Sequence, residues 1–212
     1  LDVCTPPDIS YKKALSALEL TTRWAARSKE RWQNRRSDWQ GNLFGIIQGN
    51  FYKDLRKRSA LEILELDLPG IAIGGLSVGE TFPQFEEYLG HTAELLPQDK
   101  PRYLMGIGTP DYILSAVEHG IDMFDCVFAT RTARNGAVFT DDGMIALKKA
   151  RHRFDEGPIL EGCGCRACTQ YSRGYLRHLF KTNEILGSML ATEHNLQYLY
   201  NFIQRIHTAI QN

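Results

Sequence analysis

The sequence contains no long hydrophobic run, no internal repeat and no low-complexity segment, and these absences exclude several classes of protein. No apolar stretch approaches the roughly 18 to 20 residues that cross a bilayer, and no basic-then-apolar start resembles a signal peptide. We therefore expect a soluble, cytoplasmic protein without a membrane partner. The composition, with 43% hydrophobic and 24% charged residues among 212, excludes a disordered chain, collagen and a coiled coil.

The chain also lacks a net charge, because 25 Lys and Arg residues balance 25 Asp and Glu residues. The charged residues are nevertheless distributed unevenly along the sequence. Residues 1–130 hold 14 basic and 18 acidic side chains, residues 131–181 hold 10 and 5, and residues 182–212 hold 1 and 2. A local basic zone can follow a phosphate backbone even in a neutral protein, although a solvated surface is the alternative interpretation.

Over the first 130 residues, short apolar runs rich in Gly alternate with longer amphipathic segments, which is typical of an α/β fold. We expect strands at residues 1–3, 43–48, 70–76, 102–107 and 121–127, and helices at residues 11–32, 51–66, 83–96 and 111–119. Five parallel strands fit either a barrel truncated before its fourth strand or an open doubly wound sheet. The start at Leu1, inside an apolar run, suggests that preceding residues are missing.

The pattern changes after residue 130. Residues 135–144 indicate a short hairpin with Asp142 and Gly143 as its turn signal, residues 157–164 indicate a loop, and residues 169–212 are helical in period.

Three of the five cysteines, Cys163, Cys165 and Cys168, fall within six residues. Thiolates spaced this closely suit a structural, tetrahedral zinc site that takes a fourth ligand from elsewhere. The candidates for that ligand are His178 and His194, and the pattern alone leaves both open.

Polar residues at the carboxyl ends of the predicted strands are the first candidates for chemistry, because these ends meet at one edge of a parallel sheet. They are Asp2, Gln48, Glu80, Asp122 and Asp125. Asp125 lies in an apolar run, so we expect it to be buried. A buried carboxylate is either hydrogen-bonded in a structural role or held ready as a base or nucleophile.

Several strings of residues together resemble one family, the tRNA-guanine transglycosylases, also called queuine tRNA-ribosyltransferases. They are LDVCTPP (1–7), GIIQG (45–49), GGLSVGE (74–80), YLMGIG (103–108), DMFDCV (122–127), TRTARNG (130–136) and the CxCxxC cluster, in the family's order. The resemblance covers essentially all 212 residues. It implies a zinc-bearing (β/α)₈ TIM-type barrel that lacks its N-terminal strands. Residues 1–134 would supply about strands four to eight, and residues 135–212 a zinc-binding subdomain with C-terminal helices.

The resemblance further implies a pentosyltransferase of queuosine biosynthesis. Such an enzyme exchanges the wobble guanine of the tRNA anticodon for a 7-deazaguanine base. Asp125 matches the family's nucleophile, which attacks the ribose C1′ and forms a covalent tRNA–enzyme intermediate. Asp2 matches the acceptor for the N–H groups of the purine. Gln48 and the backbone N–H of Gly75 match the donors to its carbonyl oxygen.

Other matching positions surround the base. The carbonyl of Leu76 and the side chain of Glu80 match positions beside the substituent of the deazaguanine, and Tyr103 and Met105 match the pocket wall. Cys4 and Val78 look like the bacterial type, which inserts the aminomethyl base preQ1 rather than queuine.

The C-terminal half carries the remaining implied roles. Arg131 and Arg134 match tRNA-contacting residues near the anticodon loop, and His194 matches the fourth zinc ligand. The resemblance also suggests a homodimer with the zinc region at its interface. The apolar positions of residues 185–199 are compatible with that interface and equally with packing on the parent barrel.

The family's other essential Asp lies upstream of Leu1, so these 212 residues alone are expected to be inactive. One alternative to an enzyme is a non-catalytic tRNA-binding subunit of the same family. Another is a sugar-processing barrel hydrolase, which leaves the cysteine cluster and the basic zone unexplained.

Overall fold

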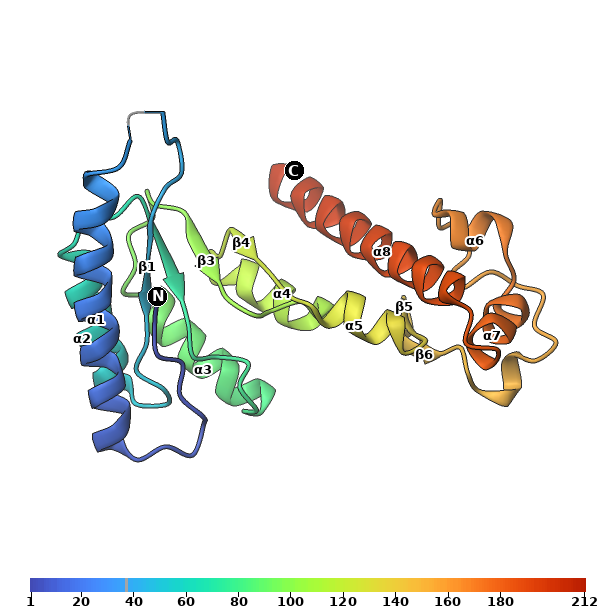
Figure 1. The fold of residues 1–212 in the computed structure, drawn as a ribbon, viewed down its shortest axis with the longest axis horizontal. Coiled ribbons are helices and arrows are strands. Elements are labelled where there is room, and N and C mark those ends of the chain that lie inside the picture. The colour runs from blue at the N-terminus through green and yellow to red at the C-terminus, as the bar shows by residue number, and fades with distance from the viewer. Residues whose placement is uncertain (37) are drawn as a thin grey trace. The chain divides into compact units, whose positions relative to one another are not determined.

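The structure, a computed structural model, describes residues 1–36 and 38–212 and divides into two compact units (Figure 1). The first unit comprises residues 1–107 and 111–126, and the second comprises residues 108–110 and 127–212. Each unit has its own core, so each is described by itself.

The first unit is built around a parallel sheet with the strand order β1-β2-β3-β4. The strands are β1 (Phe44–Ile47), β2 (Gly70–Ile73), β3 (Arg102–Leu104) and β4 (Met123–Phe124). Helices precede and connect them: α1 (Tyr11–Gln33), α2 (Lys53–Leu64), α3 (Phe82–Ala93) and α4 (Pro110–Glu118). The predicted α/β fold with a parallel sheet is confirmed.

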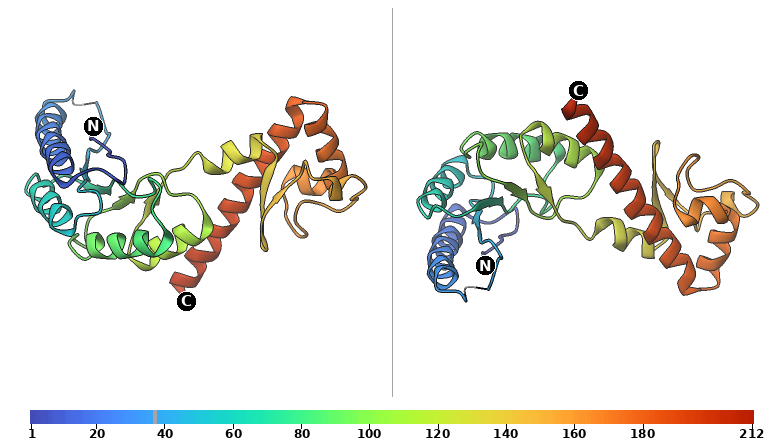
Figure 2. Two further views of the ribbon diagram at one scale, coloured as in Figure 1. Left: turned by 90° about the horizontal axis from the view of Figure 1, so that it is seen from below. Right: turned by 90° about the horizontal axis from the view of Figure 1, so that it is seen from above.

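The helices run alongside the sheet, as both views of Figure 2 show. Helix α2 packs on β1 and contacts both α1 and α3. All four residues of β2 are buried, which explains its continuous apolar sequence, because a central parallel strand is covered on both faces.

The predicted strand at residues 1–3 is wrong, because this segment has no strand assignment. The N–H of Val3 donates to Oγ1 of Thr21 on α1 at 2.9 Å instead of to a neighbouring strand. The other predicted strands exist but end earlier than expected, because the residues that follow turn out of the ladder. Gly75, for example, has a φ of +69°, which ends β2 in a left-handed conformation.

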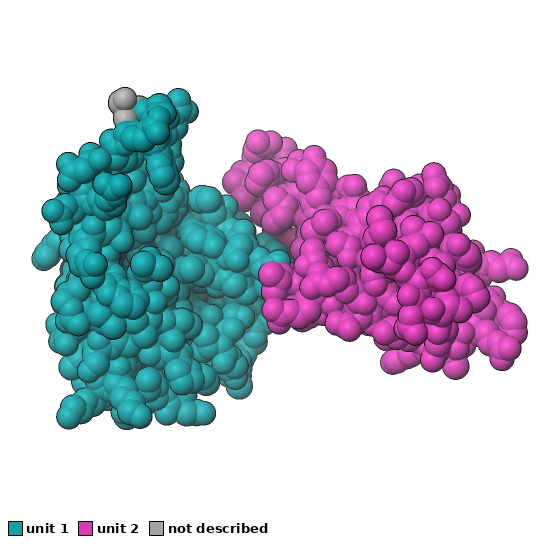
Figure 3. All heavy atoms as spheres, viewed as in Figure 1, with its two compact units in different colours: residues 1–107, 111–126 teal, residues 108–110, 127–212 magenta. Residues whose placement is uncertain are grey.

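The second unit, magenta in Figure 3, joins a hairpin to a helical region. Its elements are α5 (Phe128–Arg134), β5 (Ala137–Thr140), β6 (Gly143–Ala146), the 3₁₀ helix η1 (Ala150–His152), α6 (Arg166–Gln170), α7 (Arg173–Lys181) and α8 (Ile185–Gln211). The predicted hairpin and helical tail are confirmed. Helix α5 packs on α8 and β5, so the compact unit begins slightly before residue 135.

The fully buried side chain of Asn195 links three elements of the second unit. Its Oδ1 accepts from the N–H of Phe139 in β5 at 3.0 Å, and its Nδ2 donates to the carbonyl of Ala129 in α5 at 2.9 Å and to that of Ala137 at 3.3 Å. One amide therefore fixes α8 against the hairpin and α5. Within the described residues, no helix is long and apolar enough to cross a membrane.

We predict that Asn195→Leu lowers the free energy of unfolding by about 3 kcal/mol, because it leaves buried N–H and C=O groups unpaired. Urea unfolding followed by circular dichroism measures the loss, and hydrogen exchange of the Phe139 amide localises it. Asn201→Leu is the matched control, since Asn201 is an exposed amide on the same helix, and it should change stability by less than about 0.5 kcal/mol. Equal effects of the two substitutions would contradict the role of the buried amide.

Candidate functional site

The candidate residues of the first unit follow directly on the strands. The strand register aligns Ile47, Ile73, Leu104 and Phe124, the last residues of the four strands. The residues that come next form a second row at the carboxyl edge of the sheet: Gln48, Gly74, Met105 and Asp125. Two backbone bonds continue the ladder into this row, from Gly74 N–H to Ile47 at 2.9 Å and from Met105 N–H to Ile73 at 3.2 Å. The first and last members of the row are three strand spacings apart, or roughly 14 Å.

At the β1 end of the row, the structure brings Gln48 and Asp2 together. Nε2 of Gln48 donates to Oδ2 of Asp2 at 2.6 Å, and the N–H of Gln48 donates to Oγ of Ser59 in α2 at 3.0 Å. Gln48 is 2% exposed. Its amide and the carboxylate of Asp2 therefore present a linked set of donor and acceptor groups to the strand ends.

The two glycines that follow β2 allow this close packing. A methyl group on Gly74 would lie 2.6 Å from Nε2 of Gln48, and one on Gly75 would lie 2.5 Å from its Oε1. Any side chain at either position would displace the Gln48 amide. Leu76, the next residue, is buried at 4% exposure.

Glu80 stabilises the loop that follows Leu76. Its carboxylate accepts hydrogen bonds from the backbone N–H groups of Ser77, of Val78 at 2.8 Å and of Gly79 at 3.1 Å. Three donors converging on one carboxylate fix the turn, in which Ser77 adopts a φ of +57°. The geometry thus gives Glu80 a loop-holding role.

At the β4 end of the row, Asp125 contacts Tyr103 and the backbone of Gly106. Its Oδ1 accepts from the hydroxyl of Tyr103 at 2.5 Å and from the N–H of Gly106 at 3.0 Å. Burial and the hydrogen bond to Asp125 raise the pKa of Tyr103 to about 12, so this hydroxyl remains a donor at neutral pH. The carboxylate is oriented by two donors, and Met105 lies half-buried between Tyr103 and Gly106 in the chain.

The expectation that Asp125 is buried is wrong: its side chain is exposed. Its neighbours Met123 and Val127 are 46% and 54% exposed. The cause is the position of β4, a two-residue strand that pairs only with β3 among the described strands. The apolar sequence of this run therefore does not reflect burial within this chain.

In the second unit, Arg131 and Arg134 are exposed on the last turn of α5. Residues three apart on a helix share a face, so both guanidinium groups are presented on the same side. Neither forms an ion pair with another described residue. They are free to contact an anionic partner.

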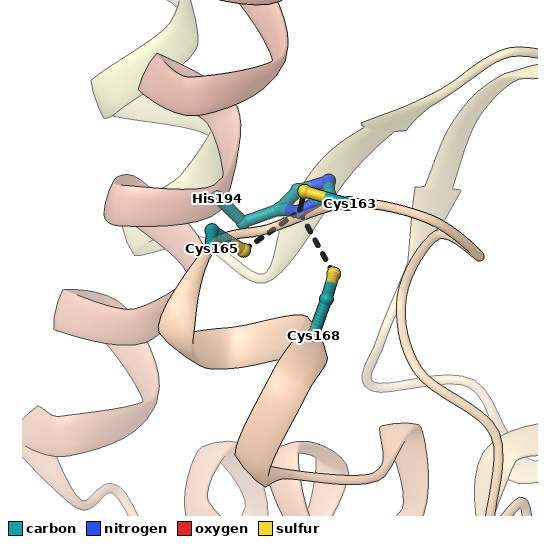
Figure 4. A group of neighbouring side chains, drawn as sticks. All are labelled: Cys163, Cys165, Cys168 and His194. Atoms are coloured by element: carbon teal, nitrogen blue, oxygen red, sulfur yellow. Dashed lines mark hydrogen bonds between the residues drawn. The ribbon is translucent and has the colours of Figure 1, made fainter.

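The cysteine cluster takes His194 as its fourth member (Figure 4). Nδ1 of His194 lies 3.8 Å from Sγ of Cys163, 3.5 Å from Sγ of Cys165 and 3.3 Å from Sγ of Cys168. All four ligand atoms lie within 4.8 Å of one another, so these residues could hold a metal ion. His178, the other candidate, is exposed on α7 and does not belong to this group.

The surroundings prepare His194 and Cys165 as ligands, whereas the pKa values of the Cys163 and Cys168 thiols are raised. Nε2 of the fully buried His194 lies 2.8 Å from the carbonyl oxygen of Phe139, so Nε2 carries the proton and Nδ1 presents its lone pair to the cysteines. A hydrogen bond from Cys168 lowers the pKa of Cys165 to about 4, and burial raises the pKa of Cys163. Deprotonating all three thiols would concentrate negative charge that only a cation can neutralise.

Sequence reasoning missed two buried polar residues of α2, Arg56 and Ser59, both 0% exposed. The signal was present, since Arg56, Ser59, Ala60 and Ile63 recur at the helical spacing of a buried face. Arg56 contacts the loops that follow β1 and β2.

A cleft of about 750 Å³ lies elsewhere in the first unit, beside the C-terminal half of α1. Trp24, Trp32 and Trp39 line it together with four arginines. The described residues around it include no carboxylate, thiol or imidazole, so it lacks the groups that acid–base or nucleophilic chemistry needs.

Comparison with known proteins places the chain in a family. The family model described as queuine tRNA-ribosyltransferase matches residues 1–212. The chain is 52% identical over 212 residues to a queuine tRNA-ribosyltransferase of Borrelia hermsii, with 100% of this chain and 56% of that protein covered. It is 51% identical over 212 residues to one of Treponema denticola, with the same coverage. It is 50% identical over 209 residues to one of Acetivibrio thermocellus, with 99% and 55% covered.

The chain thus spans about half the length of these relatives. The family match includes both the row at the strand ends and the cysteine–histidine cluster. The chain belongs to the queuine tRNA-ribosyltransferase family.

Proposed function

We propose that the whole protein, which contains this chain and has the full length of its relatives, is a tRNA-guanine transglycosylase. It exchanges the wobble guanine of the tRNA anticodon for a 7-deazaguanine. The observation that carries the proposal is the carboxylate of Asp125 at the end of β4, which Tyr103 and Gly106 orient by two hydrogen bonds. The family's description, queuine tRNA-ribosyltransferase, supports tRNA as the substrate.

The exchange takes two displacements at the same carbon. In the first, an oxygen of Asp125 bonds to the ribose C1′ while the bond from C1′ to N9 of guanine breaks, and guanine leaves with the bonding electron pair. In the second, N9 of the incoming base bonds to C1′ while the bond from C1′ to the Asp125 oxygen breaks and releases the carboxylate. The incoming base loses its N9 proton to solvent, which balances the proton that the departed guanine takes up. This is the double displacement of retaining glycosidases, in which a carboxylate traps an oxocarbenium-like centre.

The β1 end of the row supplies the groups that would recognise the base. The carboxylate of Asp2 accepts from purine N–H groups, and the Gln48 amide and the Gly75 N–H donate to the purine carbonyl. The contact between Asp2 and Gln48 supports this assignment, because it places a buried donor beside an acceptor at the strand ends. A base that is swapped has to leave its stack and be read on its polar edges.

We propose preQ1, the aminomethyl deazaguanine, as the incoming base. The peptide carbonyl of Leu76 is an acceptor for the aminomethyl group, and Glu80 holds the adjoining turn by its three backbone hydrogen bonds. Cys4 and Val78 are the residues that resemble the bacterial type.

We propose that residues 1–134 are the C-terminal portion of a (β/α)₈ barrel and that residues 135–212 are its zinc-binding subdomain with C-terminal helices. The sheet order supports a barrel, since four consecutive parallel strands follow one another without reversal. A doubly wound sheet reverses its strand order at the crevice where it binds ligands.

The basic residues of the second unit are proposed to contact tRNA. Arg131 and Arg134 are exposed on α5, and the stretch 131–181 carries 10 basic against 5 acidic side chains. Phosphate contacts by such residues position a nucleic acid without reading its sequence.

We propose that the metal of the cysteine–histidine cluster is a structural Zn²⁺. Ligand bonds of about 2.3 Å to sulfur and about 2.05 Å to nitrogen at tetrahedral angles separate S and N by about 3.6 Å. The sulfur–Nδ1 distances of 3.3, 3.5 and 3.8 Å bracket that value. Three cysteines and one histidine complete a tetrahedron and leave no open position for water.

A homodimer is proposed from the surface of the second unit. Along α8, the residues Ile185, Met189, Leu196 and Tyr200 are each more than half exposed and recur at the spacing of one helical face. On α7, Tyr175 stacks on Tyr171 at 5.4 Å between ring centroids. Exposed apolar stripes of this kind mark protein interfaces.

We predict that Asp125→Asn in the whole protein lowers exchange of labelled guanine into tRNA by on the order of a thousandfold or more, because an amide is not a nucleophile for C1′. A denaturing gel should show a covalent adduct between tRNA and the unsubstituted protein, and mass spectrometry should locate the adduct on Asp125.

Asp122→Asn is the matched control. Asp122 precedes β4. Among the residues that the structure describes, its carboxylate accepts only from the backbone N–H of Arg102, at 2.8 Å, and the Asn oxygen can retain this bond. Undiminished exchange by Asp125→Asn, or an adduct on another residue, would refute Asp125 as the nucleophile. Absence of exchange by the unsubstituted protein would favour a non-catalytic tRNA-binding subunit.

For the metal, we predict that His194→Ala lowers the zinc content from one ion per chain to near zero and destabilises the second unit, because a structural site contributes its binding energy to folding. Elemental analysis measures the zinc, and hydrogen exchange of residues 127–212 measures the stability. His178→Ala should retain the zinc, since His178 lies outside the cluster. Retention of zinc by His194→Ala would exclude this ligand set.

For the dimer, we predict that Met189→Glu in the whole protein weakens self-association by about tenfold or more, because it places a charge in the centre of the apolar stripe. Light scattering across a dilution series measures the dissociation constant. The control is Gln204→Glu, at an exposed position of the same helix. If both variants remain as dimeric as the unsubstituted protein, the stripe is covered by something other than a second copy.

A further inference from the structure

Arg56 is a fully buried cation beneath the loops of the candidate base pocket. Its side chain on α2 is 0% exposed. Burial lowers its pKa to about 10, so the guanidinium group remains positive at neutral pH. A buried charge of this kind is stable only where acceptors surround it.

Those acceptors are backbone carbonyl oxygens of two loops. Nε donates to the carbonyl of Asn50, after β1, at 2.8 Å. Nη2 donates to the carbonyls of Gly74 and Gly75, after β2, at 3.3 and 3.2 Å. The rigid planar fork of one guanidinium group therefore joins the loop that follows Gln48 to the peptides that precede Leu76.

The close approach of the chain at these loops depends on glycine. Gly49 has a φ of +131°, and a methyl group there would lie 2.6 Å from the backbone N of Arg56. A methyl group on Gly75 would meet Oε1 of Gln48 at 2.5 Å and Nη2 of Arg56 at 3.7 Å. The Gln48 amide and the guanidinium group thus pack against the same residue.

Two buried polar atoms in this region have no hydrogen-bond partner among the described residues, Nη1 of Arg56 and Oε1 of Gln48. Buried polar groups in folded proteins are almost always paired, so each unpaired group needs an explanation. Arg56 and Gln48 therefore retain unused hydrogen-bonding capacity beside the loops that follow β1 and β2.

We propose that Arg56 is a positioning residue for the base: by holding the carbonyls of Asn50, Gly74 and Gly75, it sets the spacing between the Gln48 amide and the Gly75–Leu76 peptide. This inference rests on the proposed function. Asp125 takes its hydrogen bonds from Tyr103 and Gly106, whereas the hydrogen bonds of Arg56 among the described residues go to Asn50, Gly74 and Gly75. Arg56 therefore acts on affinity for the base, while the displacement at C1′ depends on the other end of the row.

The test compares Arg56→Lys and Arg56→Gln with the unsubstituted whole protein in steady-state exchange of preQ1 into tRNA. Lysine keeps the charge but loses the planar fork, and glutamine keeps a planar donor but loses the charge. We expect each to raise KM for the base by about tenfold or more, with kcat and KM for tRNA within about threefold. Thermal unfolding of each variant reports whether it is folded.

The matched control is Arg58→Lys. Arg58 lies on the same helix, but it is partly exposed and pairs with Glu62 at 2.7 Å and Glu19 at 3.1 Å. It should leave both KM values within about twofold. Arg56→Ala adds a rescue test, since millimolar guanidinium ion should lower its KM for the base towards the original value.

Several results would overturn the proposal. They are an unchanged KM for the base in a folded Arg56 variant, a loss confined to kcat, an equal rise in KM for tRNA, and failure of both the Lys and Gln variants to fold, which would make the role purely structural. Absence of exchange by the unsubstituted protein would instead remove the proposed function itself, and this inference with it.

Discussion

The register of the parallel strands is the constraint on which the candidate site depends. Hydrogen bonds align Ile47, Ile73, Leu104 and Phe124 at the ends of four strands. The residue after each therefore enters one row, although these residues lie far apart in the sequence. Because side chains alternate between the two faces of a strand, a slip of one residue in any pair would turn a site residue to the opposite face. Backbone pairing thus determines which residues lie in the row and on which face of the sheet each side chain lies.

Two buried polar side chains fix the positions of segments that the strand register does not position. Arg56 holds the loops after β1 and β2 through three carbonyl oxygens, and Asn195 holds α8 against α5 and β5 through an N–H group and two carbonyls. In both cases one side chain pairs with backbone groups of segments that are separate in the sequence: two loops for Arg56, and helix α5 and strand β5 for Asn195. In the second unit the cysteine–histidine cluster adds a further link, because its cysteines come from the loop and α6 while His194 comes from α8.

The sequence predicted the elements whose apolar pattern has a single interpretation. The continuous run of β2 predicted the observed strand, and the Asp142–Gly143 signal predicted the observed hairpin, although its turn lies one residue earlier, at residues 141–142. Prediction from the sequence failed where the structure of an apolar run depends on which other elements pack against it. Residues 1–3 form no strand, and Asp125 is exposed. His194 could be chosen over His178 only from the family resemblance, since helical spacing is compatible with both. Arg56 escaped notice because a charged residue on a helix is ordinarily solvated, although it shares the helical spacing of the buried positions Ser59, Ala60 and Ile63.

The row divides the candidate site into two halves with different physical requirements. At β1 and β2, recognition of a planar base needs donors and acceptors at fixed spacing, and the structure supplies buried, interlocked groups on glycine-rich loops. At β3 and β4, a nucleophile needs an oriented carboxylate that a bulky ribose can reach, and the structure supplies an exposed Asp125 held by a protonated tyrosine and one backbone N–H group. Rigidity at one end and access at the other suit the proposed exchange reaction, in which the base site would release one purine and accept another while the sugar stays attached to Asp125.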